Sequence, residues 1–256
     1  MLTVTLLGKG GTGKTTSTAS LGSAYAALGY RTLLIDSDSQ ASMTEWLAPG
    51  YRYHDDGSER SEEDLAATGT TGVLTGQAKL PDAAITLTDD LDLLPNTIYG
   101  GVAEHYLNNL SRQSELQLAQ ALHDHADHYD IVLVDTPRAF DSRITFNAVE
   151  AADHICIVAE MAQSSLDALP GQLQLLREFE RNLTGVIATK VDRRTKKGQT
   201  MPDQLRQAGY TVLGEVPISA AFTTVWESRQ TPHALLPNDR ATQAYDQIAQ
   251  TLINHK

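Results

Sequence analysis

The sequence predicts an α/β protein with a mostly parallel, twisted central sheet flanked by helices. Three observations lead to this class. The first 36 residues read in order as a strand, a glycine-rich loop, a helix and a second strand. Short continuous apolar runs, the pattern of buried parallel strands, recur through the rest of the chain. Segments with helical spacing lie between these runs, and such alternation builds parallel sheets through right-handed crossovers.

Each predicted strand is a short apolar run. The first, at residues 2–7, is rich in β-forming residues, and the run at 130–135 (DIVLVD) is continuously apolar and ends in a carboxylate. The other predicted strands span residues 31–35, 91–94, 154–159, 185–190 and 211–216.

Each predicted helix repeats apolar residues at helical spacing. In the helix predicted at 111–128, for example, Leu116, Ala119 and Leu122 share one face. The other predicted helices span residues 15–28, 73–77, 165–182, 199–208 and 241–253. Because there is no internal repeat and no linker, we expect a single domain over residues 1–256.

Composition excludes several classes of protein. With 41% hydrophobic and 20% charged residues the chain is globular rather than disordered, and one cysteine excludes an intrachain disulfide. No apolar run approaches 18 residues, and the N-terminus reads as a strand rather than a signal peptide. We therefore expect a cytoplasmic protein without membrane attachment. The net charge of −12 disfavours a uniformly basic surface but allows a local basic patch.

One segment differs from the rest in charge. Residues 51–95 hold 3 basic and 10 acidic residues, with clusters of Gly and Thr. We interpret 51–90 as an acidic surface excursion that carries the short helix at 73–77.

Residues 8–15 (GKGGTGKT) match the phosphate-binding pattern G-x-x-x-x-G-K-[ST], between a predicted strand and a predicted helix. Phosphate oxygens need several backbone N–H donors at once, and glycines let the chain curl closely around the anion. The following helix adds the partial positive charge of its N-terminus. Lys14 would place a cation on the β- and γ-phosphates, and Thr15 would offer a hydroxyl to Mg²⁺. The candidate nucleotide contacts are Gly10, Gly11, Thr12, Gly13, Lys14, Thr15 and Thr16.

A second lysine, Lys9, precedes these glycines, and with it KGGTGKTT resembles the deviant Walker A box of the ParA/MinD family of P-loop ATPases. The resemblance covers most of the chain and is weakest at 51–90 and around 195–235. It implies a P-loop NTPase fold, with ATP or ADP and Mg²⁺ as ligands. It also implies that Lys9 reaches the nucleotide of a partner subunit, as an arginine finger does, so that hydrolysis requires an ATP-dependent homodimer. Lys9 and Lys14 are thus candidate catalytic residues.

Two aspartates follow the second predicted strand. In LLIDSDSQ, Asp36 and Asp38 lie at the carboxyl end of a parallel strand, the edge at which open α/β sheets bind ligands. The segment resembles the family's D-x-D-P-Q. By that match Asp38 is a catalytic residue that orients the attacking water, and Asp36 supports the metal. Ser39 stands where the family usually has proline, which is expected to loosen the loop. The alternative is that both aspartates only cap the strand end.

A further carboxylate ends the strand at 130–135. DIVLVDTPR resembles the family's Walker B and switch II segment, which implies that Asp135 holds Mg²⁺ together with Thr15. A carboxylate at the end of a buried strand costs desolvation free energy unless a cation or hydrogen-bond donors meet it. Arg138 stands where the family usually has a second proline, so we expect this segment to move or to couple to partners in an unusual way.

The segment ATKVDRRTK, at residues 188–196, resembles the family segment that often ends in D-x-R-T. Its Lys190 and Asp192 also resemble the base-reading N-K-x-D motif of related NTPases, although Thr189 replaces the asparagine. We take Lys190, Asp192 and Pro217 as candidate contacts to the adenine base.

The same region is basic in an acidic protein. Residues 177–200 hold 7 basic and 3 acidic residues, and the densest cluster is Arg193, Arg194, Lys196 and Lys197. Members of the ParA branch bind DNA without sequence preference, which needs only a few cations per subunit to neutralise phosphates. The alternative is a solvated charged loop.

The resemblance implies a ParA-type ATPase that dimerises on Mg·ATP, binds non-specific DNA on the nucleoid and drives plasmid or chromosome partition. A centromere-binding or cargo-adaptor protein would stimulate hydrolysis. Two alternatives stay open: a relative that positions a protein cargo, and a MinD-like regulator that cycles on membranes. The predicted C-terminal helix has a polar face rich in Gln and Asn rather than the basic face of a membrane-surface helix, which disfavours the second.

Overall fold

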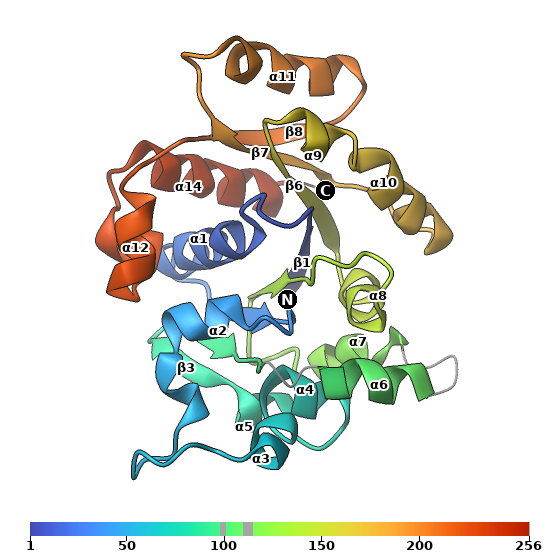
Figure 1. Ribbon diagram of the computed structural model, residues 1–256, viewed down its shortest axis with the longest axis vertical. Coiled ribbons are helices and arrows are strands. Elements are labelled where there is room, and N and C mark those ends of the chain that lie inside the picture. The colour runs from blue at the N-terminus through green and yellow to red at the C-terminus, as the bar shows by residue number, and fades with distance from the viewer. Residues whose placement is uncertain (98–100, 110–114, 256) are drawn as a thin grey trace.

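The computed structural model describes residues 1–97, 101–109 and 115–255 (Figure 1). One eight-stranded sheet runs through these residues in the order β3-β4-β2-β5-β1-β6-β7-β8. Every neighbouring pair is parallel except β3 and β4, which are antiparallel, so the prediction of a mostly parallel sheet is confirmed. The strands are β1 (Leu2–Leu7), β2 (Thr32–Asp36), β3 (Ile85–Thr88), β4 (Leu91–Leu94), β5 (Ile131–Asp135), β6 (His154–Glu160), β7 (Gly185–Val191) and β8 (Val212–Pro217).

Helices cover both faces of this sheet (Figure 1). They are α1 (Lys14–Ala27), α2 (Ser42–Leu47), the 3-10 helix η1 (Pro49–Arg52), α3 (Glu62–Ala66), α4 (Gly69–Leu74), α5 (Leu80–Ala83), α6 (Gly101–Asn109), α7 (Gln117–Asp124), α8 (Arg143–Glu150), α9 (Gln163–Leu166), α10 (Leu169–Glu178), α11 (Lys196–Gln207), α12 (Phe222–Ser228), α13 (Pro232–Leu235) and α14 (Arg240–Ile253).

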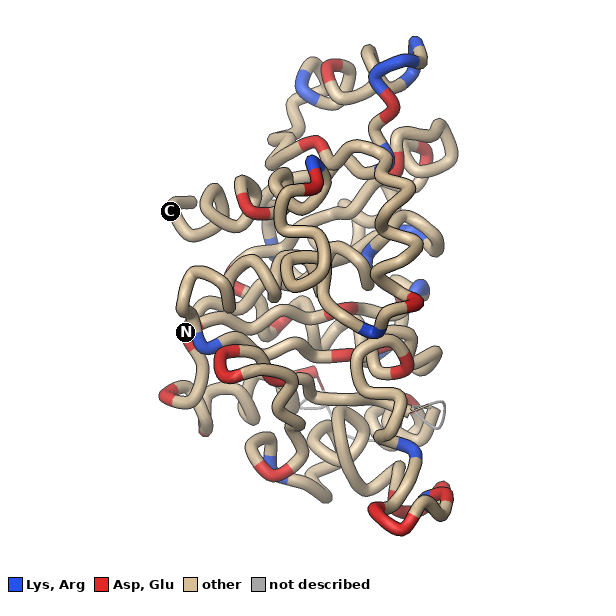
Figure 2. The backbone as a smooth tube through the Cα atoms, turned by 90° about the vertical axis from the view of Figure 1, so that its left-hand side faces the viewer, with Lys and Arg blue, Asp and Glu red and all other residues tan. Residues whose placement is uncertain are grey.

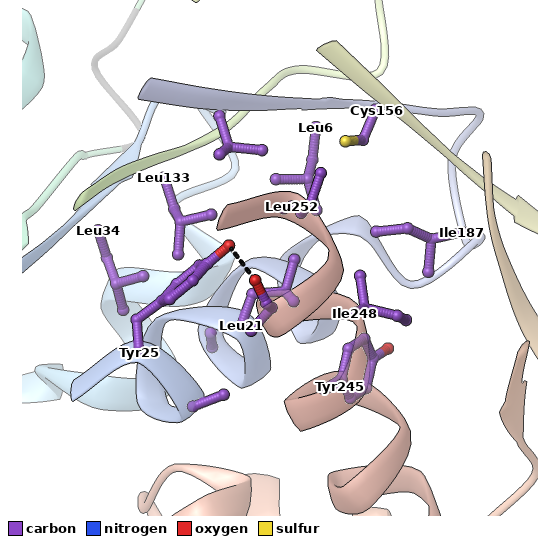
Figure 3. Close-up of a cluster of buried hydrophobic side chains, with 14 of the residues drawn as sticks. Leu6, Leu21, Tyr25, Leu34, Leu133, Cys156, Ile187, Tyr245, Ile248 and Leu252 are labelled. Atoms are coloured by element: carbon purple, nitrogen blue, oxygen red, sulfur yellow. Dashed lines mark hydrogen bonds between the residues drawn. The ribbon is translucent and has the colours of Figure 1, made fainter. Parts of the chain in front are cut away.

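On one face, α1 and α14 pack side by side against the middle of the sheet (Figure 3). Ile248 and Leu252 of α14 are fully buried there, so the C-terminal helix packs on the body as its apolar spacing predicts. Tyr25 of α1 donates a 3.2 Å hydrogen bond to the carbonyl of Ala249, which joins the two helices. This packing fixes α1, and therefore the loop before it, relative to the strands.

On the other face, two apolar clusters form the rest of the core. One joins β2, β4 and β5 to the helices from α4 to α8, and the other joins β6 and β7 to α8, α10 and α11. Cys156 of β6 lies on the α1 side of the sheet and is fully buried, and burial raises the pKa of its thiol to about 12.

The segment from 51 to 90 differs from its prediction. Residues 53–59 are exposed, but residues 69–75 of α4 and its C-terminus are buried beneath α6 and α7. The helix also begins earlier than predicted, at Gly69, whose φ of +57° favours glycine. The second half of this segment is therefore part of the core rather than a surface excursion.

Two other predicted helices have different bounds. The helix predicted at 165–182 forms two helices, because Pro170 occupies the first turn of α10 and starts a new helix there. Of the helix predicted at 111–128, residues 111–114 lie outside the described residues, and α7 covers Gln117–Asp124.

Candidate nucleotide-binding site

The glycine-rich loop joins β1 to α1 and curls tightly. Gly11 and Gly13 have φ values of +83° and +94°, a left-handed backbone that glycine adopts without strain. At Gly8 the loop passes close to β6, and a Cβ there would lie 2.6 Å from the carbonyl oxygen of Val158. The loop therefore requires glycine for both reasons that its sequence predicts, which are backbone freedom and close approach.

Lys14 lies at the first position of α1 and is buried, with 6% of its surface exposed. Its Nζ donates a 2.9 Å hydrogen bond to the carbonyl of Gly8, across the loop. Burial lowers the pKa of this ammonium, and the nearby carboxylates of Asp135 and Asp38 act against that shift. A cation held inside the curve of a glycine loop is suited to bind phosphate.

Two carboxylates meet at the end of the sheet beside this lysine. Asp36, the last residue of β2, lies in register with Asp135, the last residue of β5. Asp36 accepts hydrogen bonds from the backbone N–H (2.9 Å) and hydroxyl (2.8 Å) of Thr44, and Asp135 accepts one from the hydroxyl of Thr15 (2.7 Å). In both residues Oδ1 is buried and has no hydrogen-bond partner among the described residues.

The surroundings shift the proton affinity of both carboxyl groups. Burial raises the pKa of Asp36 to about 7. Burial and the charge of Asp36 raise the pKa of Asp135 to about 8, although Thr15 and Lys14 oppose the shift. Two partly unpartnered carboxylates so close together are stabilised in their charged forms only by a cation.

The hydroxyl and carboxylate oxygens at this end of the sheet fit Mg²⁺, which prefers oxygen ligands. The Thr15 hydroxyl and the Asp135 carboxylate supply two, and Asp36 lies beside them. No group of three or more His, Cys, Asp and Glu side chains in the described part of the chain could hold a metal ion by itself. Mg²⁺ commonly keeps waters and binds substrate phosphates alongside one or two carboxylates.

Asp38 lies two residues beyond β2, on the phosphate side of the site. Its Oδ1 accepts a 3.0 Å hydrogen bond from the N–H of Gln40, and its carbonyl accepts one of 3.2 Å from Asn96. Its carboxylate raises the pKa of Lys14, so the two charges act on each other. Its side chain is half-buried. The structure thus brings Asp38, Lys14 and Asp135 together at one end of the sheet, as the resemblance to the family implies.

Lys9 is exposed at the outer edge of the loop. Its carbonyl accepts hydrogen bonds from the N–H (3.3 Å) and hydroxyl (2.9 Å) of Thr12, which hold the loop turn. Its ammonium makes no hydrogen bond or ion pair within the described residues. The side chain is therefore available to a partner molecule.

A cavity of about 310 Å³ opens beside the loop, on the side of β7 and β8. Its size and mostly apolar lining suit a purine base. Of the candidate adenine contacts, Lys190 and Pro217 line it and Asp192 does not. The lining residues are Thr12, Gly13, Thr16, Thr189, Lys190, Val216, Pro217, Ile218, Ser219, Phe222, Ala241 and Tyr245.

Sequence reasoning missed two aromatic residues of this cavity, Phe222 and Tyr245. Their rings lie 6.4 Å apart, and the Tyr245 hydroxyl lies 2.8 Å from that of Ser17 in α1. They come from α12 and α14, which follow the motif segments by many residues. No motif marks them, and only the packing of α14 on α1 brings Tyr245 to the site.

Lys190 lies between the cavity and the phosphate loop. Its backbone has a φ of +52°, and its Nζ donates to the carbonyl of Gly11 (2.8 Å) and to Glu160 (3.0 Å). Its neighbour Thr189 donates a 2.6 Å hydrogen bond to the carbonyl of Thr12. These contacts tie the end of β7 to the loop.

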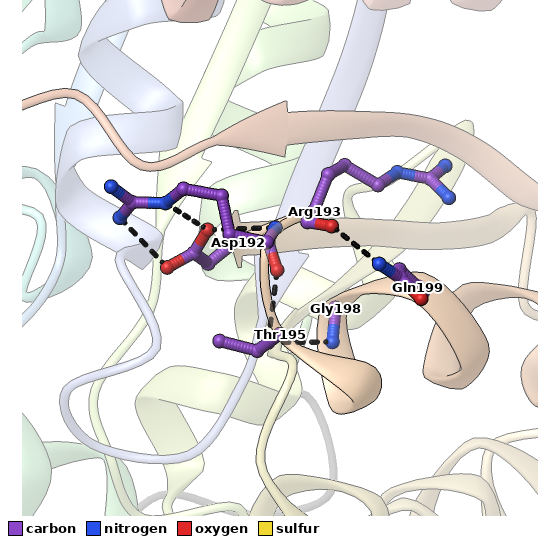
Figure 4. Close-up of polar contacts among 6 residues, drawn as sticks. Asp192, Arg193, Thr195, Gly198 and Gln199 are labelled. Atoms are coloured by element: carbon purple, nitrogen blue, oxygen red, sulfur yellow. Dashed lines mark hydrogen bonds and ion pairs between the residues drawn. The ribbon is translucent and has the colours of Figure 1, made fainter.

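The basic cluster follows the end of β7 and continues into the start of α11 (Figure 4). Asp192 pairs with Arg194 through two side-chain hydrogen bonds, and Arg193 pairs with Glu215. Lys196 and Lys197 are exposed in the first turn of α11 and form no ion pair with a described residue. The two lysines are therefore the readily available cations of the cluster.

Charge is distributed unevenly between the two ends of the molecule (Figure 2). Residues 190–206 hold six basic and two acidic residues, whereas residues 55–64 hold six acidic and one basic. Because the first group lies around α11 and the second around α3, at the opposite end in Figure 1, the net charge of −12 does not describe the surface at α11.

Comparison with known proteins decides the family. A family model described as an AAA domain matches residues 4–188. The chromosome partitioning protein ParA of Caulobacter vibrioides is 33% identical over 210 residues, which cover 77% of this chain and 72% of that protein. The chain belongs to the ParA/MinD family of P-loop ATPases. It is an ATPase.

Two further similarities bear on fold and function. The maintenance of carboxysome distribution protein A of Synechococcus elongatus is 29% identical over 87% of this chain and 88% of its own length. The crystal structure of cobyrinic acid a,c-diamide synthase from Mycobacterium smegmatis, with bound ADP and magnesium, matches with a TM-score of 0.78 and 22% identity, over 100% of this chain and 95% of that one. At that identity the structural match supports the P-loop fold alone. Within the described residues of this ParA/MinD-family chain, no helix has the length and apolar character needed to cross a bilayer.

Proposed function

We propose that this protein is a ParA-type ATPase that dimerises on Mg·ATP, binds DNA without sequence preference and partitions plasmid or chromosomal DNA. One observation supports the ATP site above all. Buried Lys14 lies beside two carboxylate oxygens that have no hydrogen-bond partner among the described residues, and a base-sized cavity opens on the other side of the same loop. Phosphates, metal and base thus each have a matching set of groups.

In this proposal each group has a distinct role. Lys14 and the backbone N–H groups of residues 10–16 bind the phosphates, and Thr15 and Asp135 hold Mg²⁺ with support from Asp36. Mg²⁺ neutralises charge on the phosphates when it is bound. Asp38, half-buried and close to Lys14, orients the water that attacks the terminal phosphate. Lys190 and Pro217 contact the adenine base, with Phe222 and Tyr245 completing the apolar wall.

The exposed position of Lys9 supports the formation of a dimer. Its ammonium projects from the exposed edge of the loop without a described partner, although it belongs to a phosphate-binding sequence. A lysine in this place can neutralise charge on the nucleotide of a second subunit. Two ATP molecules between two subunits would then hold the homodimer, and hydrolysis would release it.

Non-specific DNA binding is supported by the surface around α11. Lys196 and Lys197 lie at the N-terminus of that helix, where the helix dipole disfavours cations, so their placement does not serve the stability of α11. Arg193 and Arg194 form ion pairs with Glu215 and Asp192, and they can add to this surface by leaving these carboxylates to pair with DNA phosphates. Dimerisation doubles the number of cations, which suits a salt-dependent interaction with phosphates.

Retention on random-sequence DNA tests this function. We expect retention with ATP, loss with ADP or no nucleotide, and a steep decrease with salt. Replacing both Lys196 and Lys197 by Ala should weaken binding and reduce its salt dependence. Lys79→Ala is the matched control, since Lys79 is an exposed lysine at the acidic end of the molecule. Unchanged DNA binding by the double variant would contradict the assignment of this surface.

A second candidate is the positioning of a protein cargo, which uses the same ATP cycle with a different adaptor. The similarity to the carboxysome distribution protein favours it, because that match covers more of this chain than the match to the Caulobacter protein does. Co-purification from the native host would separate the candidates. A centromere-binding partner supports partition, and an adaptor from a protein assembly supports positioning.

A further inference from the structure

Arg138 is a cation at the phosphate loop that the functional assignment above does not use. It lies three residues beyond Asp135, in the connection from β5 to α8. Its side chain packs on the loop itself, since a Cβ on Gly10 would lie 2.9 Å from its Cδ and 3.4 Å from its Nε. A side chain longer than that of glycine at position 10 would displace it. Arg138 therefore lies directly over the exposed tip of the loop.

The guanidinium is also an electrostatic neighbour of Lys14. Burial is the largest cause that lowers the pKa of the Lys14 ammonium, and the nearby positive charge of Arg138 acts in the same direction. Arg138 is exposed, and no carboxylate or carbonyl among the described residues accepts a hydrogen bond from it. The positive charges of Lys14 and Arg138 repel each other at this loop, and an anion bound between them would offset that repulsion.

The order of the strands shows which part of the nucleotide this cation would meet. The base-sized cavity lies on the side of β7 and β8, lined by Lys190 and Pro217. Arg138 follows β5, which lies on the other side of β1 in the sheet. A nucleotide that places its base in the cavity extends its phosphates across the loop toward β5, so its last phosphate is the one closest to Arg138.

We propose that the Arg138 guanidinium contacts the terminal phosphate of ATP bound in its own subunit, and that this contact makes the site prefer ATP over ADP. The inference rests on the proposed nucleotide site. Arginine suits the task, because its planar fork of donors pairs with two phosphate oxygens at once and stays charged at any physiological pH. ADP lacks the phosphate that Arg138 would contact, and so gains nothing from it.

Equilibrium binding of two nucleotides to Arg138 variants tests this proposal. The Kd values of ADP and of a non-hydrolysable ATP analogue are measured with Mg²⁺, at protein concentrations at which sedimentation shows a monomer. We expect Arg138→Ala to weaken binding of the analogue about 10-fold or more and to change ADP binding less than about twofold. Arg138→Lys should weaken binding of the analogue less than Arg138→Ala does, because lysine keeps the positive charge but lacks the paired donors of the guanidinium.

Arg177→Ala is the matched control, since Arg177 is an exposed arginine on α10 and its loss changes the net charge equally. Its two Kd values should equal those of the wild type. Equal weakening of both nucleotides by Arg138→Ala, or no change in either, would overturn the proposal. A loss that appears only at concentrations at which dimers form would also overturn it, because the contact would then cross to the partner subunit.

These results are separable from failure of the proposed function. If the nucleotide site itself is wrong, Lys14→Ala leaves the binding of both nucleotides unchanged. If only the inference about Arg138 is wrong, the wild type binds both nucleotides and Lys14→Ala abolishes that binding, but Arg138→Ala leaves the ratio of the two Kd values unchanged.

Discussion

Thr15 donates a 2.7 Å hydrogen bond to Asp135, from the first turn of α1 to the last residue of β5, across 120 positions of sequence. This bond engages one oxygen of Asp135 and leaves Oδ1 buried without a partner among the described residues. The phosphate loop and the second carboxylate are thereby held together before any ligand binds, which is the preorganisation that a Mg·nucleotide site requires.

Removal of the Thr15 hydroxyl should uncouple Mg²⁺ from nucleotide binding. In the wild type we expect a lower Kd for ADP with Mg²⁺ than with a chelator. In Thr15→Ala we expect the ratio of these two Kd values to decrease about 10-fold. Calorimetric titration under both conditions measures it. Ser20→Ala is the control, since it removes a hydroxyl that donates a hydrogen bond to the carbonyl of Thr16 within α1. An undiminished Mg²⁺ effect in Thr15→Ala would exclude Thr15 from the metal site.

The two buried carboxyl groups predict how stability depends on pH. Their pKa values of about 7 (Asp36) and about 8 (Asp135) exceed the value of about 3.9 for an unfolded chain. Between these limits the folded state binds more protons than the unfolded state, so their contribution makes the free energy of unfolding fall as pH rises from about 4 to about 8.

We therefore expect the Tm of nucleotide-free protein to fall over this range, and to fall less in Asp135→Asn. Because Mg·ADP replaces the proton as the partner of these oxygens, its stabilisation of the wild type should grow with pH. Thermal unfolding across a pH series, with and without Mg·ADP, measures both effects. Equal slopes in the wild type and Asp135→Asn would contradict the burial of an unpaired carboxylate there.

Local patterns in the sequence predicted much of this site because they report local geometry. The strands Leu2–Leu7 and Leu91–Leu94 were predicted with their observed bounds, because apolar runs encode them directly. The helix after the glycine-rich loop begins at Lys14, one residue earlier than predicted. Placement of Asp36 and Asp38 at one sheet edge followed from strand direction alone. Their closeness to Asp135 depends on strand order, which the sequence does not display.

The features that were not predicted depend on packing between distant segments. Phe222 and Tyr245 reach the base cavity only because α14 packs on α1, and Arg138 covers Gly10 only through the path of the chain after β5. Helix α8 was missed although a local signal exists, since Ser142 caps it by accepting a hydrogen bond from the N–H of Thr145. β3 was missed because its short alternating pattern lies within the acidic segment.

Asp38 should be required for turnover but not for nucleotide binding. We expect Asp38→Ala to keep the Kd for ATP within about threefold and to lower the rate of hydrolysis about 100-fold, because general-base or water-positioning groups contribute on that scale. A phosphate-release assay and a binding titration together measure this. Asp89→Ala, which removes an exposed carboxylate from the β3–β4 turn, should leave both quantities unchanged. Normal hydrolysis by Asp38→Ala would remove this residue from the site.

The two tryptophans of the chain stack on each other and join α2 to α12. Their ring centroids lie 4.3 Å apart, and Trp46 also donates a 3.1 Å hydrogen bond to the carbonyl of Val225. Trp46 is 2% exposed and Trp226 is 37% exposed. We expect Trp46→Ala to lower the free energy of unfolding by about 3–5 kcal/mol and Trp226→Ala by about 1 kcal/mol. Urea denaturation measures both, and equal losses would contradict this difference in burial.

The central claim is that the loop around Lys14 binds the phosphates of ATP, and equilibrium binding of ATP to Lys14→Ala and Lys9→Ala tests it most directly. We predict that Lys14→Ala abolishes binding of both ATP and ADP, because it removes the buried cation of the loop. Lys9→Ala should still bind both nucleotides as a monomer, since the exposed side chain of Lys9 acts on the partner subunit. Tight ATP binding by Lys14→Ala would contradict the account.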